Sequence, residues 1–167
     1  MLRALAKNDG VAMVNFWPMF ISGEYGTAAR AWMEKNGARW KEIRAKLKDD
    51  PIAAREALAK IRAEEPMPKV PLSVLIDHID HMVQVAGVDH VGLGSDFDGV
   101  DALPEGIDGV DSLPKITLEL LRRGYKDEDV LKILGENLLR VLERAEAFSR
   151  SKRTTLSGDG SLRRIDK

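Results

Sequence analysis

The run from Gly87 to Gly99 constrains the fold of this chain more than any other stretch. Apolar residues alternate with glycines over residues 91–94, a pattern typical of a short strand that neighbouring backbone or a ligand approaches closely. A loop rich in Asp and Gly follows Ser95. Because barrel enzymes keep their functional residues at the carboxyl ends of parallel strands, we expect Asp96 to point into a functional site.

A helix is expected directly before this strand, because residues 72–86 place their apolar side chains on one stripe. Gly87 follows as its expected C-terminal cap. An earlier strand is predicted over residues 11–16, a continuous apolar run broken only by Asn15, as in a parallel strand covered on both faces. These helix and strand signals indicate an alternating α/β organisation.

Further helices are expected from apolar spacing and turn residues, at 2–8, 26–48, 51–64, 114–123, 127–134 and 136–148. The acidic cap Asp50 followed by Pro51 is a common helix opening. The polar segment 149–167 is expected to be a disordered tail. The predicted domain therefore spans residues 1–148.

Composition excludes several classes of protein. The 26 basic and 27 acidic residues give a net charge of −1, so bulk charge attracts neither nucleic acid nor an anionic membrane. No apolar run approaches the roughly 18 residues of a spanning helix. Cysteine is absent, which excludes disulfides and thiolate metal sites and fits a reducing compartment such as the cytoplasm without locating the protein there.

Four stretches carry a family resemblance: Val14–Pro18, Asp77–Gly99, Glu119–Tyr125 and Gly135–Val141. Together they are similar to roughly the C-terminal half of the membrane (renal) dipeptidase family of zinc metallopeptidases. A complete barrel needs about 250 residues, more than the 167 here. The resemblance therefore implies an α/β fold that is the C-terminal part of a TIM-like (β/α)8 barrel, with its last two strands, a helical insertion between them and a C-terminal helical cluster.

The same resemblance implies hydrolysis of dipeptides at a two-zinc centre. In the family a His-x-Asp pair, a bridging Glu and two further His hold the zinc ions, and this set would precede Met1. We therefore assign no metal ligand within this chain and expect the isolated chain to be inactive. By resemblance, Asp96 is the catalytic residue beside the zinc ions, hydrogen-bonded to substrate or to the bridging water.

Spacing alone leaves the roles of these carboxylates open. Asp96 and Asp98 are two residues apart, so in extended backbone they would point the same way, but aspartates in Gly-rich turns also cap the loop. We expect Asp98 to be structural. Trp17 and Phe20 follow the first strand at the same rim and are candidates to line a substrate pocket, with packing under the helical insertion as the alternative.

The histidines are expected to be structural. His78 and His81 are one helical turn apart, as metal ligands often are. However, the helical angle places His81 nearly opposite the apolar stripe and His78 at its border. His90 begins the strand, at the end away from the functional rim.

Two other functions stay open at this stage. One is a truncated binding or assembly module whose open strand edges are completed by another chain, either a second copy or an N-terminal half. The other is a different metal-dependent hydrolase of the same barrel superfamily, such as a deacetylase or a lactonase. The upstream ligand pattern distinguishes the latter from a dipeptidase.

Overall fold

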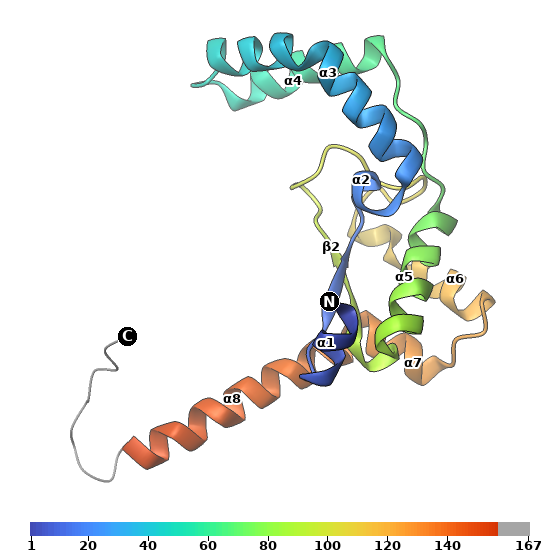
Figure 1. Cartoon of the computed structure of the whole chain (residues 1–167), viewed down its shortest axis with the longest axis vertical. Helices are drawn as coiled ribbons and strands as arrows, with labels where there is room; N and C mark the ends of the chain where they lie inside the picture. The colour runs from blue at the N-terminus through green and yellow to red at the C-terminus, as the bar shows by residue number, and fades with distance from the viewer. Residues whose placement is uncertain (157–167) are drawn as a thin grey trace. The chain divides into compact units, whose positions relative to one another are not determined.

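The computed structural model describes residues 1–156, a mixed α/β arrangement of helices and one two-stranded sheet (Figure 1). Its main elements are α1 Leu2–Lys7, β1 Ala12–Asn15, α2 Pro18–Ile21, α3 Gly23–Lys46, α4 Pro51–Glu64, α5 Leu72–Ala86, β2 Val91–Ser95, α6 Leu113–Arg122, α7 Asp127–Leu131 and α8 Asn137–Leu156. A 3-10 turn, Val88–His90, leads into β2, and a π-helical segment, Lys132–Glu136, joins α7 to α8.

The two strands pair in parallel. Where they begin, the carbonyl oxygen of Gly10 lies 2.8 Å from Nδ1 of His90. Where they end, the backbone N–H of Phe16 donates to the carbonyl oxygen of Ser95 (3.1 Å). Both strands therefore finish at the same edge of the sheet, as the alternating α/β pattern predicts.

The chain divides into two compact units. The first comprises Met1–Val14, Ile79–Gly94 and the chain from Leu120, and the second comprises Asn15–His78 and Ser95–Glu119. Each unit has its own apolar core. The fully buried side chains include Ile79, Val91, Leu120 and Ile133 in the first, and Phe16, Leu75, Ile76 and Ile116 in the second.

Asn137 is the buried polar residue in the core of the first unit, with 3% of its surface exposed. Its Nδ2 donates to the carbonyl oxygens of Val88 (2.7 Å) and Val91 (2.9 Å). A buried amide that satisfies two backbone acceptors fixes the chain where it enters β2. His90 helps here through its contact with Gly10, which agrees with the structural role expected for it.

The glycines of β2 make room for Met13 of β1. A Cβ atom on Gly92 would lie 2.7 Å from Sδ of Met13, and one on Gly94 would lie 2.9 Å from its Cβ. The close neighbour predicted at these glycines is therefore a side chain of the adjacent strand.

A helical hairpin, α3 with α4, dominates the second unit, and its two helices lie side by side (Figure 1). Each helix has a side-chain cap: Ser22 accepts from the N–H of Tyr25 (3.2 Å), and Asp50 accepts from the N–H of Ala53 (3.0 Å). The pair is bridged on its exposed side by Arg39 and Glu64 (2.8 Å).

The sequence predicts most of these elements correctly. Both strands, the helix at 51–64 and the helix at 72–86 are confirmed. Met13 of β1 is 37% exposed, so this strand is not covered on both faces as predicted. Gly87 follows the helix with a positive φ of 94°, but its ψ of 152° is extended and is not that of a left-handed helix cap. The helix expected at 26–48 begins earlier, at Gly23, after the short helix α2.

The last helix differs from the expectation at its C-terminal end. It was expected to end at 148, but α8 continues to Leu156. The remainder of the expected tail, 157–167, lies outside the described residues. No helix among residues 1–156 has the length and hydropathy required to span a membrane.

Candidate active site

Asp96 lies immediately after β2 at the edge where both strands end. Its Oδ2 accepts a hydrogen bond from Nδ2 of Asn15, the last residue of β1 (2.7 Å). Ser95 and Asp96 both have left-handed backbone, with φ of 35° and 69°. Backbone of this kind is uncommon outside glycine and concentrates at functional sites. The Asp96 carboxylate therefore lies at the end that the two strands share.

The loop after Asp96 turns sharply. The N–H of Gly99 donates to the backbone oxygen of Asp96 (3.1 Å), and residues 97–99 form a turn. Asp98 also has left-handed backbone (φ 65°), so the extended geometry that would point both carboxylates the same way is absent. Asp96 contacts Asn15, whereas Asp98 lines a cavity formed by the following loop.

Trp17 and Phe20 lie together just beyond β1. Their rings meet edge to face with centroids 5.0 Å apart. Phe20 is 61% exposed, whereas Trp17 is half-buried and its Nε1 donates to Oδ1 of Asp101 (3.0 Å). The two aromatic residues are therefore available as an apolar surface next to the Asn15–Asp96 pair.

Arg62 of α4 connects the helical hairpin to the same loop. Its guanidinium forms an ion pair with Asp101 and lies 5.2 Å from the ring centroid of Trp32. The hydroxyl of Tyr25 and Nε1 of Trp32 are buried without a hydrogen-bond partner among the described residues. Burial raises the pKa of the Tyr25 hydroxyl, and the nearby positive charge of Arg62 partly opposes this rise.

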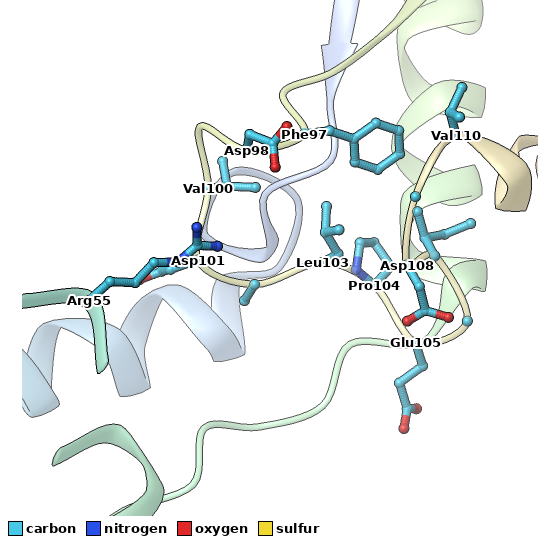
Figure 2. Close-up of a pocket in the computed structure, with 14 residues that line it drawn as sticks. Arg55, Phe97, Asp98, Val100, Asp101, Leu103, Pro104, Glu105, Asp108 and Val110 are labelled. Atoms are coloured by element: carbon cyan, nitrogen blue, oxygen red, sulfur yellow. The ribbon is translucent and has the colours of Figure 1, made fainter. Parts of the chain in front are cut away.

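The loop that follows Asp96 forms a cavity of about 700 Å³ (Figure 2). Phe97, Asp98 and residues 100–110 line it together with Arg55 of α4, whose side chain extends toward Asp101. The acidic lining residues are Asp98, Asp101, Glu105 and Asp108. This cavity lies within the second unit, as Asp96 and the aromatic residues do.

The described residues do not form a metal centre. Within 1–156, no group of three or more His, Asp or Glu side chains is placed to hold a metal ion. His81 is exposed and His78 is half-buried, positions that match those predicted from the helical angle. The residues present therefore do not fit a two-zinc site by themselves.

Asp96 and the side chains around it are the groups of this site that can take part in chemistry. Asp96 is exposed, and its carboxylate accepts a hydrogen bond from Asn15, so its other lone pairs can accept a proton or a hydrogen bond from a bound molecule. Trp17 and Phe20 offer apolar contact beside it. A strand-end carboxylate in a mixed α/β chain is the arrangement that barrel enzymes use.

A comparison with known protein families identifies the family of this chain. The sequence profile of the membrane dipeptidases, peptidase family M19, matches residues 1–156. The protein belongs to this family. The resemblance carried by the four sequence stretches is thereby confirmed.

Solved dipeptidase structures share the fold. The probable dipeptidase PvdM from Pseudomonas aeruginosa is 26% identical and superposes with a TM-score of 0.57 over 83% of this chain and 38% of its own. The M19 metallopeptidase dipeptidase AC is 23% identical (TM-score 0.57, 86% and 30%). A metallopeptidase from Rhodobacter sphaeroides, liganded with a phosphinate mimic of L-Ala-D-Ala, is 24% identical (TM-score 0.56, 86% and 29%).

The chain spans about a third of the length of these solved dipeptidases, between 29% and 38%. The sequence resemblance suggested roughly half, so this estimate was too high.

Sequence reasoning missed three residues of the candidate site. Asn15 carried a signal, because it is the one polar interruption of the apolar run 11–16 and lies close to the aromatic residues. Asp101 and Arg62 carried none that is visible locally. Asp101 is separated from Trp17 by 84 positions in the sequence, and charged residues at such separations pair only once the chain is folded.

Proposed function

We propose that this chain is the C-terminal segment of a metallodipeptidase built on a TIM-like (β/α)8 barrel, and that Asp96 is its catalytic carboxylate. The observation that carries the proposal is the Asn15–Asp96 hydrogen bond, which holds the carboxylate at the shared end of two parallel strands. Family membership supports peptide hydrolysis over the deacetylase and lactonase alternatives.

In this proposal Asp96 accepts and returns a proton at the scissile peptide, or orients the group that does so, as a general acid and base. The zinc ions of the family, when bound, supply an activated water molecule and polarise the substrate carbonyl. Their ligands would come from the part of the barrel that this segment does not contain. The Asn15 amide keeps one carboxylate oxygen engaged, which leaves the other for substrate or water.

Trp17 and Phe20 are proposed to contact the substrate through their apolar faces, the exposed Phe20 most directly. The Rhodobacter sphaeroides metallopeptidase binds a mimic of L-Ala-D-Ala. Dipeptides with small side chains are therefore the substrates to test first. Phe20 lacks a hydroxyl, so it can shape the pocket but cannot donate a hydrogen bond to the substrate.

The isolated chain tests the proposed origin of the metal ligands. Calorimetric titration with zinc and a turnover assay on mixed dipeptides are expected to give neither tight binding nor hydrolysis. Stoichiometric zinc binding together with turnover would place the whole metal centre within this chain.

A chimera tests the catalytic proposal. Residues 1–156 replace the matched segment of the Rhodobacter sphaeroides metallopeptidase, so that the remainder of the chain is supplied by a solved relative. The folded chimera is expected to hydrolyse L-Ala-D-Ala in the presence of zinc. A folded chimera without activity would contradict the proposal.

A second candidate, an assembly module completed by another chain, is favoured by exposed apolar side chains on α8. Leu138, Leu139 and Leu142 are exposed by 46%, 55% and 52%. Surfaces of this kind often mark a contact with a partner. Size-exclusion chromatography tests this candidate. A homo-oligomer, or a stable complex with an N-terminal dipeptidase fragment, supports it. A monomer that does not bind the fragment contradicts it.

A further inference from the structure

The helical hairpin α3–α4 is connected to Asp96 by an unbroken series of polar contacts. Arg62 on the hairpin pairs with Asp101, and Asp101 accepts from the indole of Trp17. The backbone of Trp17 in turn donates to Asn15, and Asn15 donates to Asp96. All of these residues belong to the second unit.

The orientation of the Asn15 amide is determined by this series. The backbone N–H of Trp17 can only donate, so the atom 2.8 Å from it must be the Asn15 oxygen, Oδ1. The other end of the amide, Nδ2, therefore faces Asp96 and donates to its carboxylate (2.7 Å). If Trp17 moved, the amide would be free to rotate, and Asp96 would lose its donor.

Asp101 holds the indole of Trp17 through a hydrogen bond. One carboxylate oxygen accepts from Nε1 of Trp17 (3.0 Å), and the other pairs with Arg62. Arg62 is itself restrained, because its guanidinium lies over the ring of Trp32, a residue that is 6% exposed. A cation held by stacking and by an ion pair is a firmer anchor than an exposed lysine on a flexible stem.

The backbone around Asp96 requires such support. Ser95 and Asp96 both have left-handed φ angles, which persist only where the surroundings over-determine them. The Asn15–Asp96 hydrogen bond is the long-range side-chain contact that holds the Asp96 carboxylate among the described residues.

We propose that Arg62 and Asp101 are positioning residues for the Asp96 carboxylate, so that the helical hairpin sets the geometry of the active-site rim through Trp17 and Asn15. The inference rests on the proposed function for its catalytic meaning, because it treats Asp96 as the reacting carboxylate. The series of contacts itself can be tested without any activity.

The test uses nuclear magnetic resonance on the full chain. R62Q and D101N are expected to shift the side-chain amide resonances of Asn15. They are also expected to speed solvent exchange of the Trp17 indole proton about five- to tenfold, the equivalent of one lost hydrogen bond. R62K keeps the charge but loses the planar group over Trp32, so it is expected to restore the Asn15 signal only in part. The control R39Q breaks the Arg39–Glu64 bridge of the same hairpin and is expected to leave both signals unchanged.

Two results would overturn the inference. One is an unchanged Asn15 amide in folded R62Q and D101N variants. The other is an equal change in R39Q, which would mean that any weakening of the hairpin has the same effect.

In the chimera, R62Q is expected to lower kcat about tenfold with KM nearly unchanged, because misplacement of a catalytic group affects the chemical step. A rise in KM alone would contradict positioning. Failure of the proposed function can be told apart from failure of this inference. A chimera that stays active after D96N contradicts the proposed function, whereas the resonance changes in R62Q test the series of contacts by themselves.

Discussion

Gly99 lies against the carboxylate of Asp96, so closely that a methyl group at position 99 would overlap Oδ1. The overlapping atom is the end of an exposed side chain, so it can move at little cost in stability. We expect G99A to change the free energy of unfolding by less than about 1 kcal/mol and yet to displace the carboxylate from Asn15. The Asn15 side-chain amide resonance reports this displacement.

The matched control for G99A is G23A, because a Cβ at position 23 would meet no atom within 4 Å. It is expected to leave the Asn15 amide resonance unchanged. A G99A variant with an unshifted Asn15 amide would show that the Asp96 carboxylate is not confined as described.

Replacement of Asn137 by alanine is expected to destabilise the first unit. N137A leaves the carbonyl oxygens of Val88 and Val91 without their buried donor, which costs about 1–3 kcal/mol of unfolding free energy. Urea denaturation measures it. The control N36A removes a half-buried contact to the backbone of Trp32 within a helix and is expected to cost less than about 0.5 kcal/mol. Equal effects would contradict the role assigned to Asn137.

The two glycines of β2 are expected to differ in their tolerance of alanine. A Cβ on Gly94 would press on the Cβ and backbone of Met13, whereas one on Gly92 would meet the flexible end of that side chain. We therefore expect G94A to cost about 1–3 kcal/mol and G92A distinctly less, by thermal or urea unfolding. Addition of M13A is expected to remove the loss of stability caused by G92A, because the side-chain end is then gone. It is expected to remove only part of the loss caused by G94A, because the Cβ and backbone of residue 13 remain. The reverse order of the two alanine variants would contradict the strand packing.

The raised pKa of the Tyr125 hydroxyl predicts that the folded protein loses stability at high pH. Burial raises the pKa of its hydroxyl above the ordinary 10.0, and the hydrogen bond to Asp80 (2.7 Å) raises it further. A raised pKa in the folded state means that the contribution to stability is complete below pH 10 and is lost as pH rises through the folded-state value.

The stability advantage of the wild type over Y125F is therefore expected to shrink as pH rises above about 10. Urea unfolding at a series of pH values measures this difference. An advantage that stays constant to high pH would mean that Tyr125 is not held in its neutral form.

The elements that sequence predicted well are those with a strong local signal. The apolar stripe of 72–86 and the glycine at which this helix ends require only neighbours along the chain, and the position of Asp96 at the strand end follows from the run 87–99. The shared edge of β1 and β2 also follows from an alternating α/β pattern.

What sequence could not predict depends on contacts between distant segments. Asn15 and Asp96 are 81 positions apart, and nothing local pairs Arg62 with Asp101. The turn at 97–99 depends on left-handed backbone at Asp96 and Asp98, which the two-residue spacing does not reveal. For the same reason, the spacing alone left the capping and catalytic roles of these carboxylates open.

The most direct test of the account is the rate of L-Ala-D-Ala hydrolysis by the zinc-loaded chimera with D96N and, separately, with D98N. Both substitutions keep the shape of the side chain, and asparagine accepts the left-handed backbone found at both positions. The account predicts that D96N lowers kcat by about 10²–10⁴-fold and that D98N changes it less than about threefold. A folded D96N chimera that retains full activity, or equal losses in the two variants, would contradict it.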